Sequence, residues 1–160
     1  MIYIHIPFCK QRCVYCGFYS TAANSVSESY IDAVCTELKL RSDYLTNKEI
    51  QTIYLGGGTP SLLTIEQLTR IQNTLTELFD LSKLKEVTLE CNPEQLTEQH
   101  LNNLKNTNFI NRLSIGVQSF DNDDLKLLNR RHSCTDAINA TKNAQKAGFD
   151  NISLDLIYGI

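Results

Sequence analysis

Short apolar runs alternate with amphipathic stretches along this chain of 160 residues, and this alternation constrains its fold more than any other feature. Such a pattern is typical of repeated strand–helix units arranged around a parallel sheet. The runs with the length and composition of strands are 2–6, 52–55, 86–89, 112–115 and 151–157. The sequence therefore predicts an α/β fold built on a parallel sheet of five strands.

The amphipathic stretches between these runs carry start and stop signals of helices. Helices are predicted to open at or near Ser25, Thr64, Thr97, Asp121 and Ser133. In the first, Ser25 and Glu28 are placed as a capping box, and apolar residues follow at helical spacing as far as Leu45. In the last, Ser133 and Asp136 open a helix that Gly148 closes as a residue just past its end.

Composition excludes several classes of function. Lys and Arg number 15 against 18 Asp and Glu, which gives a net charge of −3 and leaves no basic field for nucleic acid or an anionic membrane. No apolar run has the length of a membrane span. With 42% hydrophobic residues the chain can bury one core, so we expect a single cytoplasmic domain.

Cys9, Cys13 and Cys16 follow the spacing C-x3-C-x2-C, which places three thiolates within eight residues. A [4Fe–4S] cluster normally takes one cysteine on each of its four irons, so a set of three leaves one iron open to an external ligand. A zinc site completed by His5 or by a more distant cysteine is an alternative. A redox pair of Cys13 and Cys16 is another, although it would leave Cys9 over. The remaining cysteines, Cys35, Cys91 and Cys134, are scattered, and Cys35 and Cys91 are predicted to be ordinary buried thiols.

Polar and glycine-rich segments follow the predicted strands, at the edge where parallel sheets carry their chemistry. After the second strand, the glycines of 56–60 would let backbone N–H groups approach a ligand. Glu90 ends the third strand, where it could accept hydrogen bonds from ribose hydroxyls or simply be a solvated strand-end residue. Asp155 lies among apolar neighbours of the fifth strand, where a buried carboxylate would indicate a function or a structural ion pair.

Taken together, six motifs resemble the radical S-adenosylmethionine superfamily, and more narrowly the oxygen-independent coproporphyrinogen III oxidase family with its HemW-type heme chaperones. The motifs lie at 3–16, 56–60, 90–93, 116–120, 129–132 and 155–159. The resemblance spans the whole chain but lacks the rest of the family's barrel and its C-terminal domain. It implies that residues 1–160 are an incomplete radical SAM core domain, a partial (β/α) barrel truncated after about five strands. An apolar sheet edge exposed in this way predicts low solubility or dimerisation.

The resemblance also implies roles for residues that match the family's motifs. Cys9, Cys13 and Cys16 would ligate a [4Fe–4S] cluster whose fourth iron is chelated by the amino and carboxylate groups of S-adenosylmethionine. One S-adenosylmethionine would be held by Tyr3, Gly57, Gly58, Thr59 and Glu90. The positions that bind a second molecule in the oxidases are here Tyr15, Gln118, Arg130 and Asp155. Arg130 and Asp155 could instead form a plain salt bridge.

Phe18 bears on the choice within the family. Coproporphyrinogen oxidases typically have a further cysteine two residues after the third, whereas this chain has Phe18 there, a form that resembles the chaperones. The resemblance therefore favours a protein that binds heme and passes it to acceptor proteins, with an electron donor for the cluster. An oxidoreductase of the coproporphyrinogen III dehydrogenase type and a non-catalytic metal-binding fragment are the alternatives.

Overall fold

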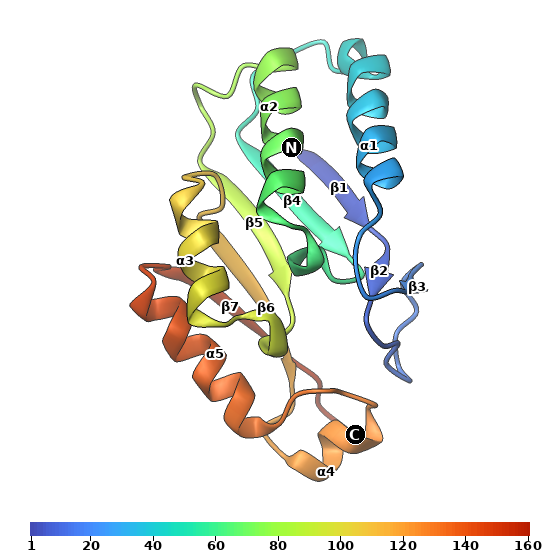
Figure 1. Ribbon diagram of the computed structural model, residues 1–160, viewed down its shortest axis with the longest axis vertical. Helices are drawn as coiled ribbons and strands as arrows, with labels where there is room; N and C mark the ends of the chain where they lie inside the picture. Colours follow the sequence, from blue (N-terminus) through green and yellow to red (C-terminus); the bar gives the residue numbers. More distant parts are fainter.

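The computed structural model describes all residues, 1–160, and contains one five-stranded sheet in which every neighbouring pair of strands is parallel (Figure 1). Its strands are β1 (Ile2–Ile6), β4 (Thr52–Gly57), β5 (Glu86–Cys91), β6 (Arg112–Gln118) and β7 (Asn151–Leu156). Their order in the sheet is the order in the sequence, with β1 and β7 at the two edges. This confirms the predicted α/β fold, and the sheet is open rather than closed into a barrel.

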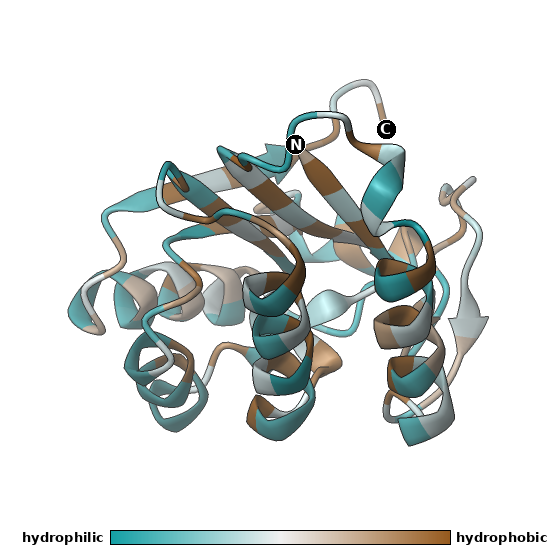
Figure 2. Cartoon of the chain, turned by 90° about the horizontal axis from the view of Figure 1, so that it is seen from above, coloured by the Kyte–Doolittle hydropathy of each residue, from teal (hydrophilic) through white to brown (hydrophobic).

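The main helices all lie on one side of the sheet, as the view from above shows (Figure 2). They are α1 (Glu28–Leu40), α2 (Ile65–Leu78), α3 (Glu98–Asn106) and α5 (Cys134–Lys146). A short helix, α4 (Asn122–Leu127), follows β6, and single 3₁₀ turns occur at η1 (Ser42–Tyr44), η2 (Pro60–Leu62) and η3 (Pro93–Gln95). None of these helices is both long and apolar enough to cross a membrane.

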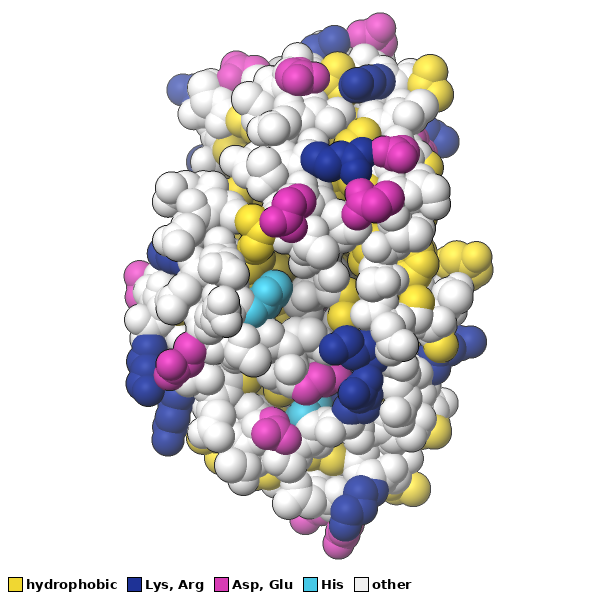
Figure 3. Space-filling model, viewed as in Figure 1, with side chains coloured by type: hydrophobic (Ala, Val, Ile, Leu, Met, Phe, Trp, Pro, Cys, Tyr) yellow, Lys and Arg dark blue, Asp and Glu magenta, His cyan; other side chains and the backbone are white.

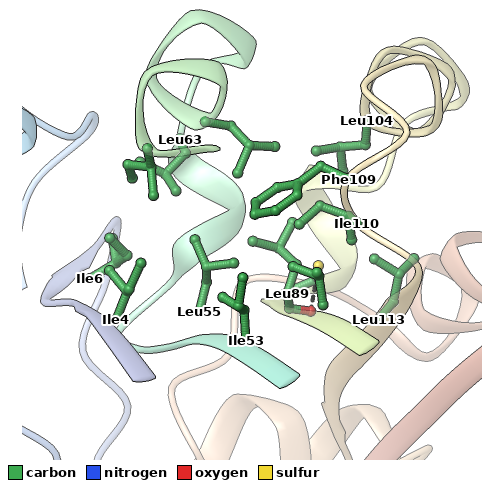
Figure 4. Close-up of a cluster of buried hydrophobic side chains, with 14 of the residues drawn as sticks. Ile4, Ile6, Ile53, Leu55, Leu63, Leu89, Leu104, Phe109, Ile110 and Leu113 are labelled. Atoms are coloured by element: carbon green, nitrogen blue, oxygen red, sulfur yellow. Dashed lines mark hydrogen bonds between the residues drawn. The ribbon is translucent and has the colours of Figure 1, made fainter. Parts of the chain in front are cut away.

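The two faces of the sheet differ in polarity because strand side chains point alternately to either side. Those toward the helices are apolar and join a core of 27 buried residues, part of which is drawn in Figure 4. The labelled strand residues in that view include Ile4, Ile53, Leu89 and Leu113. The intervening residues of the same strands are largely polar, for example Thr88 and Ser114. Burial of the apolar face fixes the register, and the opposite face is left for polar chemistry.

The helix starts confirm most of the sequence signals. Thr64 caps α2 in a capping box with Gln67, and Ser133 does the same for α5 with Asp136. Thr97 caps α3 through its hydroxyl. Gly148 follows Ala147, the C-cap of α5, with a φ of +84°, the left-handed conformation that glycine adopts without strain.

The predicted start of α1 was wrong. Ser27, not Ser25, precedes the helix, and its hydroxyl accepts a hydrogen bond from the Tyr30 amide. Glu28 is consequently the first helical residue and lies too early to close a capping box. The helix also ends at Leu40, and Leu45 packs on the core from beyond the following 3₁₀ turn.

The three-cysteine segment leaves the sheet at the carboxyl end of β1. Two short strands, β2 (Phe8–Cys9) and β3 (Thr21–Ala22), close it at its base. The Thr21 amide donates to the Pro7 carbonyl at 2.6 Å, and the Ala23 amide donates to the Cys9 carbonyl at 2.8 Å. Residues 10–20, the cysteine loop, therefore project from the sheet beside its carboxyl edge (Figure 1).

The burial expected for Asp155 was also wrong. This residue is exposed, because β7 is an edge strand. Leu154 and Leu156, which point to the helix side, are also 38% and 57% exposed. Low solubility or dimerisation through this edge stays a prediction. On the helix side of the molecule, acidic and basic side chains are interspersed rather than gathered by sign (Figure 3).

Candidate cofactor site

A cavity of about 160 Å³ opens at the carboxyl ends of the strands, beside the cysteine loop. It brings together all the predicted site residues except Tyr3. These are Cys9, Cys13, Tyr15, Cys16, Gly57, Gly58, Thr59, Glu90, Gln118, Arg130 and Asp155. They come from every strand of the sheet or the segment after it, so the parallel topology alone explains why they meet.

The three thiols share this cavity without forming a compact metal-binding group. No three His, Cys, Asp or Glu side chains lie close enough to hold a single metal ion. A zinc site needs its ligands around one ion, whereas a [4Fe–4S] cluster takes each thiolate on a different iron. All six cysteines are free thiols. No zinc site of three such ligands is therefore preformed at these cysteines.

Two of the thiols accept hydrogen bonds from the body of the protein. The Thr59 hydroxyl donates to Cys9 Sγ at 3.5 Å, and Arg130 Nη1 donates to Cys13 Sγ at 3.3 Å. Donors of this kind stabilise negative charge on sulfur, the state in which cysteine binds iron. Cys9 and Cys13 thus each have a hydrogen-bond donor beside the sulfur.

Arg130 does not form the alternative salt bridge with Asp155. Its Nη2 donates to Asn92 Oδ1 at 2.7 Å and to the Gly116 carbonyl at 2.6 Å. Asp155 instead accepts a hydrogen bond from the Ser114 hydroxyl at 3.2 Å. The guanidinium therefore keeps an uncompensated positive charge at the cavity wall, which favours an anionic group of a ligand.

Glu90 is not the solvated strand-end residue considered above. Its carboxylate accepts hydrogen bonds from the Tyr54 hydroxyl at 2.7 Å and from the Gly57 amide at 2.9 Å. Burial, together with this carboxylate, raises the pKa of Tyr54, so the phenol stays protonated and donates. Glu90 is thereby fixed in the wall between β4 and β5.

Tyr3 lies behind this wall rather than in the cavity. Its ring stacks on Tyr54 with the centroids 6.0 Å apart, and its hydroxyl is 2.9 Å from His5 Nδ1. Burial and the nearby Glu90 raise the pKa of Tyr3. A larger apolar cavity of about 470 Å³ adjoins Tyr3 between β1 and α1, but none of the three cysteines lines it.

The glycines after β4 serve close packing more than an open cradle of amides. Gly57 has a φ of +114°, and a Cβ there would lie 2.5 Å from the His5 ring. A Cβ on Gly58 would lie 2.7 Å from the Phe8 carbonyl oxygen. The Gly57 amide donates to Glu90 and the Gly58 amide donates to the Ile6 carbonyl. The sequence had suggested that these amides are free to approach a ligand, and neither is.

Two further residues of the site were not identified from the sequence. Asn92 bridges Thr59 and Arg130, and Asn129 holds the cysteine loop through Gln11 and the Arg12 carbonyl. Both belong to motifs noted above. Their side chains act on residues distant in the sequence, which a motif alone does not reveal.

Comparison with known proteins assigns the chain to a family. The profile described as the Radical SAM superfamily matches residues 3–160. This chain belongs to the radical SAM superfamily. Membership in this superfamily implies a [4Fe–4S] cluster and S-adenosylmethionine, and the thiols, donors and carboxylates of the cavity are compatible with both.

Individual radical SAM relatives are similar over nearly the whole chain. The heme chaperone HemW of Lactococcus lactis is 37% identical over 99% of this chain and 41% of its own length, and that of Bacillus subtilis 38% over 99% and 42%. An oxygen-independent coproporphyrinogen III oxidase of Salmonella typhimurium is 32% identical over 99% of this chain and 35% of its own length.

The solved structure of coproporphyrinogen III oxidase (HemN) from Escherichia coli, a radical SAM enzyme, matches with a TM-score of 0.85. It is 30% identical, and the match covers 99% of this chain and 37% of that one. The chain thus spans about two fifths of the length of the curated relatives it matches.

Proposed function

We propose that this chain forms the cofactor-binding part of a heme-handling radical SAM protein of the HemW type. The observation that carries the proposal is the single cavity in which three thiols meet strand-end carboxylates and a guanidinium that no carboxylate pairs with. In this proposal Cys9, Cys13 and Cys16 ligate a [4Fe–4S] cluster, and one iron is left for S-adenosylmethionine. Residues 1–160 would then be part of a radical SAM core domain.

The chain's own residues would bind and orient S-adenosylmethionine. Glu90 offers acceptors for ribose hydroxyls. Gly57, Gly58 and Thr59 would form the wall against which the ligand packs. Tyr3 would act from behind by holding Tyr54 and Glu90 in place.

The opposite wall would serve a second ligand. Tyr15, Gln118, Arg130 and Asp155 line the same cavity, from the cysteine loop, β6, the segment before α5, and β7. Burial and the neighbouring Cys13 raise the pKa of Tyr15, so its phenol stays a neutral hydrogen-bonding group. When the cofactors are bound, the reduced cluster supplies the electron that cleaves the sulfonium, a chemistry for which the protein provides position and a dry site.

Heme transfer rather than tetrapyrrole oxidation is the activity we propose for the whole protein. Phe18 stands at the position where the oxidases typically carry a further cysteine, and it is 65% exposed beside the cluster site. The identities of 37–38% to HemW proteins, against 32% to the oxidase, support the same choice. Acceptor proteins for heme and an electron donor are part of this proposal.

Oxidation of coproporphyrinogen III is the second candidate, favoured by the similarity to the HemN structure. Heme titration followed by absorption spectroscopy, run beside an anaerobic assay for decarboxylated product, separates the two. Tight heme binding without product supports the chaperone, and product formation supports the oxidase. A protein that shows neither heme binding nor product formation would refute both candidates.

The cluster is tested by anaerobic reconstitution and EPR of the dithionite-reduced protein, with and without S-adenosylmethionine. We expect a [4Fe–4S]⁺ signal that shifts when S-adenosylmethionine is added. Cys13→Ser should abolish the signal, whereas Cys134→Ser, a matched change outside the cavity, should not. The assignment fails if wild type gives no cluster or a signal that S-adenosylmethionine leaves unchanged.

A further inference from the structure

A continuous path of hydrogen bonds connects two of the three cysteine thiols, and Asn92 lies at its centre. Asn92 Nδ2 donates to Thr59 Oγ1 at 3.0 Å, and the Thr59 hydroxyl donates to Cys9 Sγ at 3.5 Å. On the other side, Arg130 Nη2 donates to Asn92 Oδ1 at 2.7 Å, and Arg130 Nη1 donates to Cys13 Sγ at 3.3 Å. One amide thus organises donors to Cys9 and Cys13.

The direction of every bond along this path follows from the chemistry of the groups. Arginine has donors only, so the oxygen of the Asn92 amide must face Arg130 and its NH₂ must face Thr59. Thr59 Oγ1 then accepts from Asn92, and its own proton is free for the sulfur of Cys9. The path has no freedom to reverse.

The groups of the path are held before any cofactor binds. Thr59 is 2% exposed, so its hydroxyl has little access to water. The second bond of Arg130 Nη2, to the Gly116 carbonyl at 2.6 Å, fixes the guanidinium. Asp155 binds Ser114 instead of Arg130, so no carboxylate cancels the positive charge near Cys13.

We propose that Asn92 is a positioning residue that directs the Thr59 hydroxyl to Cys9 and the Arg130 guanidinium to Cys13, and thereby sets the reduction potential of the cluster. The inference rests on the proposed cluster at these cysteines. Hydrogen bonds to ligating sulfurs are among the factors that set the potential of an iron–sulfur cluster. They stabilise negative charge, and the reduced cluster carries one more negative charge than the oxidised one, so the path raises the potential.

Asn92→Asp tests the proposal directly. A carboxylate only accepts, so the Thr59 hydroxyl should turn toward Asp and leave Cys9, while a negative charge is added. We expect reduction to become about tenfold less favourable, equivalent to a potential about 59 mV lower for a one-electron couple. An EPR-monitored redox titration measures this. Asn92→Ala leaves the hydroxyl free to donate to Cys9 and should shift the potential less.

A second background and a matched control distinguish the hydrogen-bond path from a charge that acts merely through space. Thr59→Val removes the hydroxyl, so Asn92→Asp should lower the potential less in Thr59→Val than in wild type. An equal shift in both backgrounds would overturn the path. Asn111→Asp adds the same charge at the amino ends of the strands, away from the cavity. Asn111 there joins the start of β6 to β5, and its replacement should leave the potential unchanged.

A measurement without cofactor keeps this inference separate from the proposed function. In the cluster-free protein, the amides of Val14 and Cys16 donate to the Leu128 and Cys13 carbonyls. Asn92→Ala removes one of the two acceptors of Arg130 Nη2 and should speed the hydrogen–deuterium exchange of these amides, whereas Asn92→Asp keeps both acceptors and should not.

These two measurements fail independently. A wild-type protein that forms no cluster would refute the proposed function, and the exchange rates would still test the hydrogen-bond path. Exchange unaffected by Asn92→Ala would show that Asn92 does not direct Arg130 to Cys13. A potential unaffected by Asn92→Asp, in a protein that does form the cluster, would show that Asn92 does not set it.

Discussion

Gln11 and Asn129 are 118 residues apart in the sequence and bind each other at the rim of the cluster site. Gln11 Nε2 donates to Asn129 Oδ1 at 2.6 Å and to the Asn129 carbonyl at 3.1 Å. Asn129 Nδ2 donates in return to the Arg12 carbonyl at 2.8 Å. The cysteine loop, which has little regular structure of its own, is thereby attached to the segment between α4 and α5.

Removing the Asn129 side chain should loosen the cysteine loop without straining the backbone. Asn129 has a φ of +59°, so Asn129→Gly keeps the conformation and loses only the side-chain bonds. Two lost hydrogen bonds of about 1 kcal/mol each predict that trypsin cleaves the cluster-free protein after Arg12 about 5-fold to 30-fold faster. Timed digestion with mass spectrometry measures this.

Asn108→Gly is the matched control for that digestion. Asn108 also has a positive φ, of 51°, but lies after α3, away from the cysteine loop. Its replacement should leave cleavage after Arg12 unchanged. If both variants are cleaved at the wild-type rate, the contacts of Asn129 do not restrain the loop.

The carboxylate of Glu90 should stabilise the fold as well as line the site. Glu90→Gln keeps an acceptor for the Gly57 amide but turns a neutral NH₂ donor toward Tyr54, so the bond from the Tyr54 hydroxyl to a charged carboxylate is lost. We expect the free energy of unfolding to fall by about 1–3 kcal/mol in urea denaturation.

Tyr54→Phe provides the comparison, since it removes only the hydroxyl of the same pair and should cost about 1 kcal/mol. The double variant should be less destabilised than the sum of the two single changes, because both act on one hydrogen bond. Strict additivity would mean that the pair contributes nothing as a pair.

Gly58 is required for close packing between the turn after β4 and the backbone of β2. A Cβ at this position would lie 2.7 Å from the Phe8 carbonyl oxygen and 2.9 Å from that of Ile6, both of which are backbone atoms that cannot swing away. Gly58→Ala should therefore lower stability by about 1–3 kcal/mol. Gly17→Ala, where no atom lies within 4 Å, should change it by less than about 0.5 kcal/mol. Similar losses in the two variants would contradict this steric explanation.

Acid should destabilise the protein through His132. Burial lowers the pKa of His132, as does the charge of Arg130, while Glu94 and Asp136 act in the opposite direction more weakly. The unfolded chain then binds more protons near the ordinary value of about 6.5, so stability is complete above that pH and falls as the pH drops below it. Thermal unfolding between pH 7.5 and 5 measures the effect.

His132→Gln keeps a donor for the Val117 carbonyl, which His132 Nε2 contacts at 3.0 Å, and removes the titrating group. The variant should lose less stability on acidification than wild type. Some acid sensitivity should persist, since burial also lowers the pKa of His100. Equal acid sensitivity of the variant and wild type would exclude His132 as its source.

The sequence predicted the elements well because their signals are local. Strand periodicity placed each strand of the sheet to within two or three residues, and Thr64, Thr97 and Ser133 marked true helix starts. The start of α1 was misplaced because two serines compete there, and the choice of Ser27 depends on where the helical backbone begins. Local patterns rank such candidates poorly.

The sequence alone determined the strand–helix order, the spacing of Cys9, Cys13 and Cys16, and the residues that follow the strands. Only the tertiary structure decided that Arg130 binds Asn92 and not Asp155, and that Glu90 is held rather than solvated. The physical reason is range. Periodicity and caps are set by neighbours in the chain, whereas a buried donor takes whichever acceptor the packed sheet brings within about 3 Å of it.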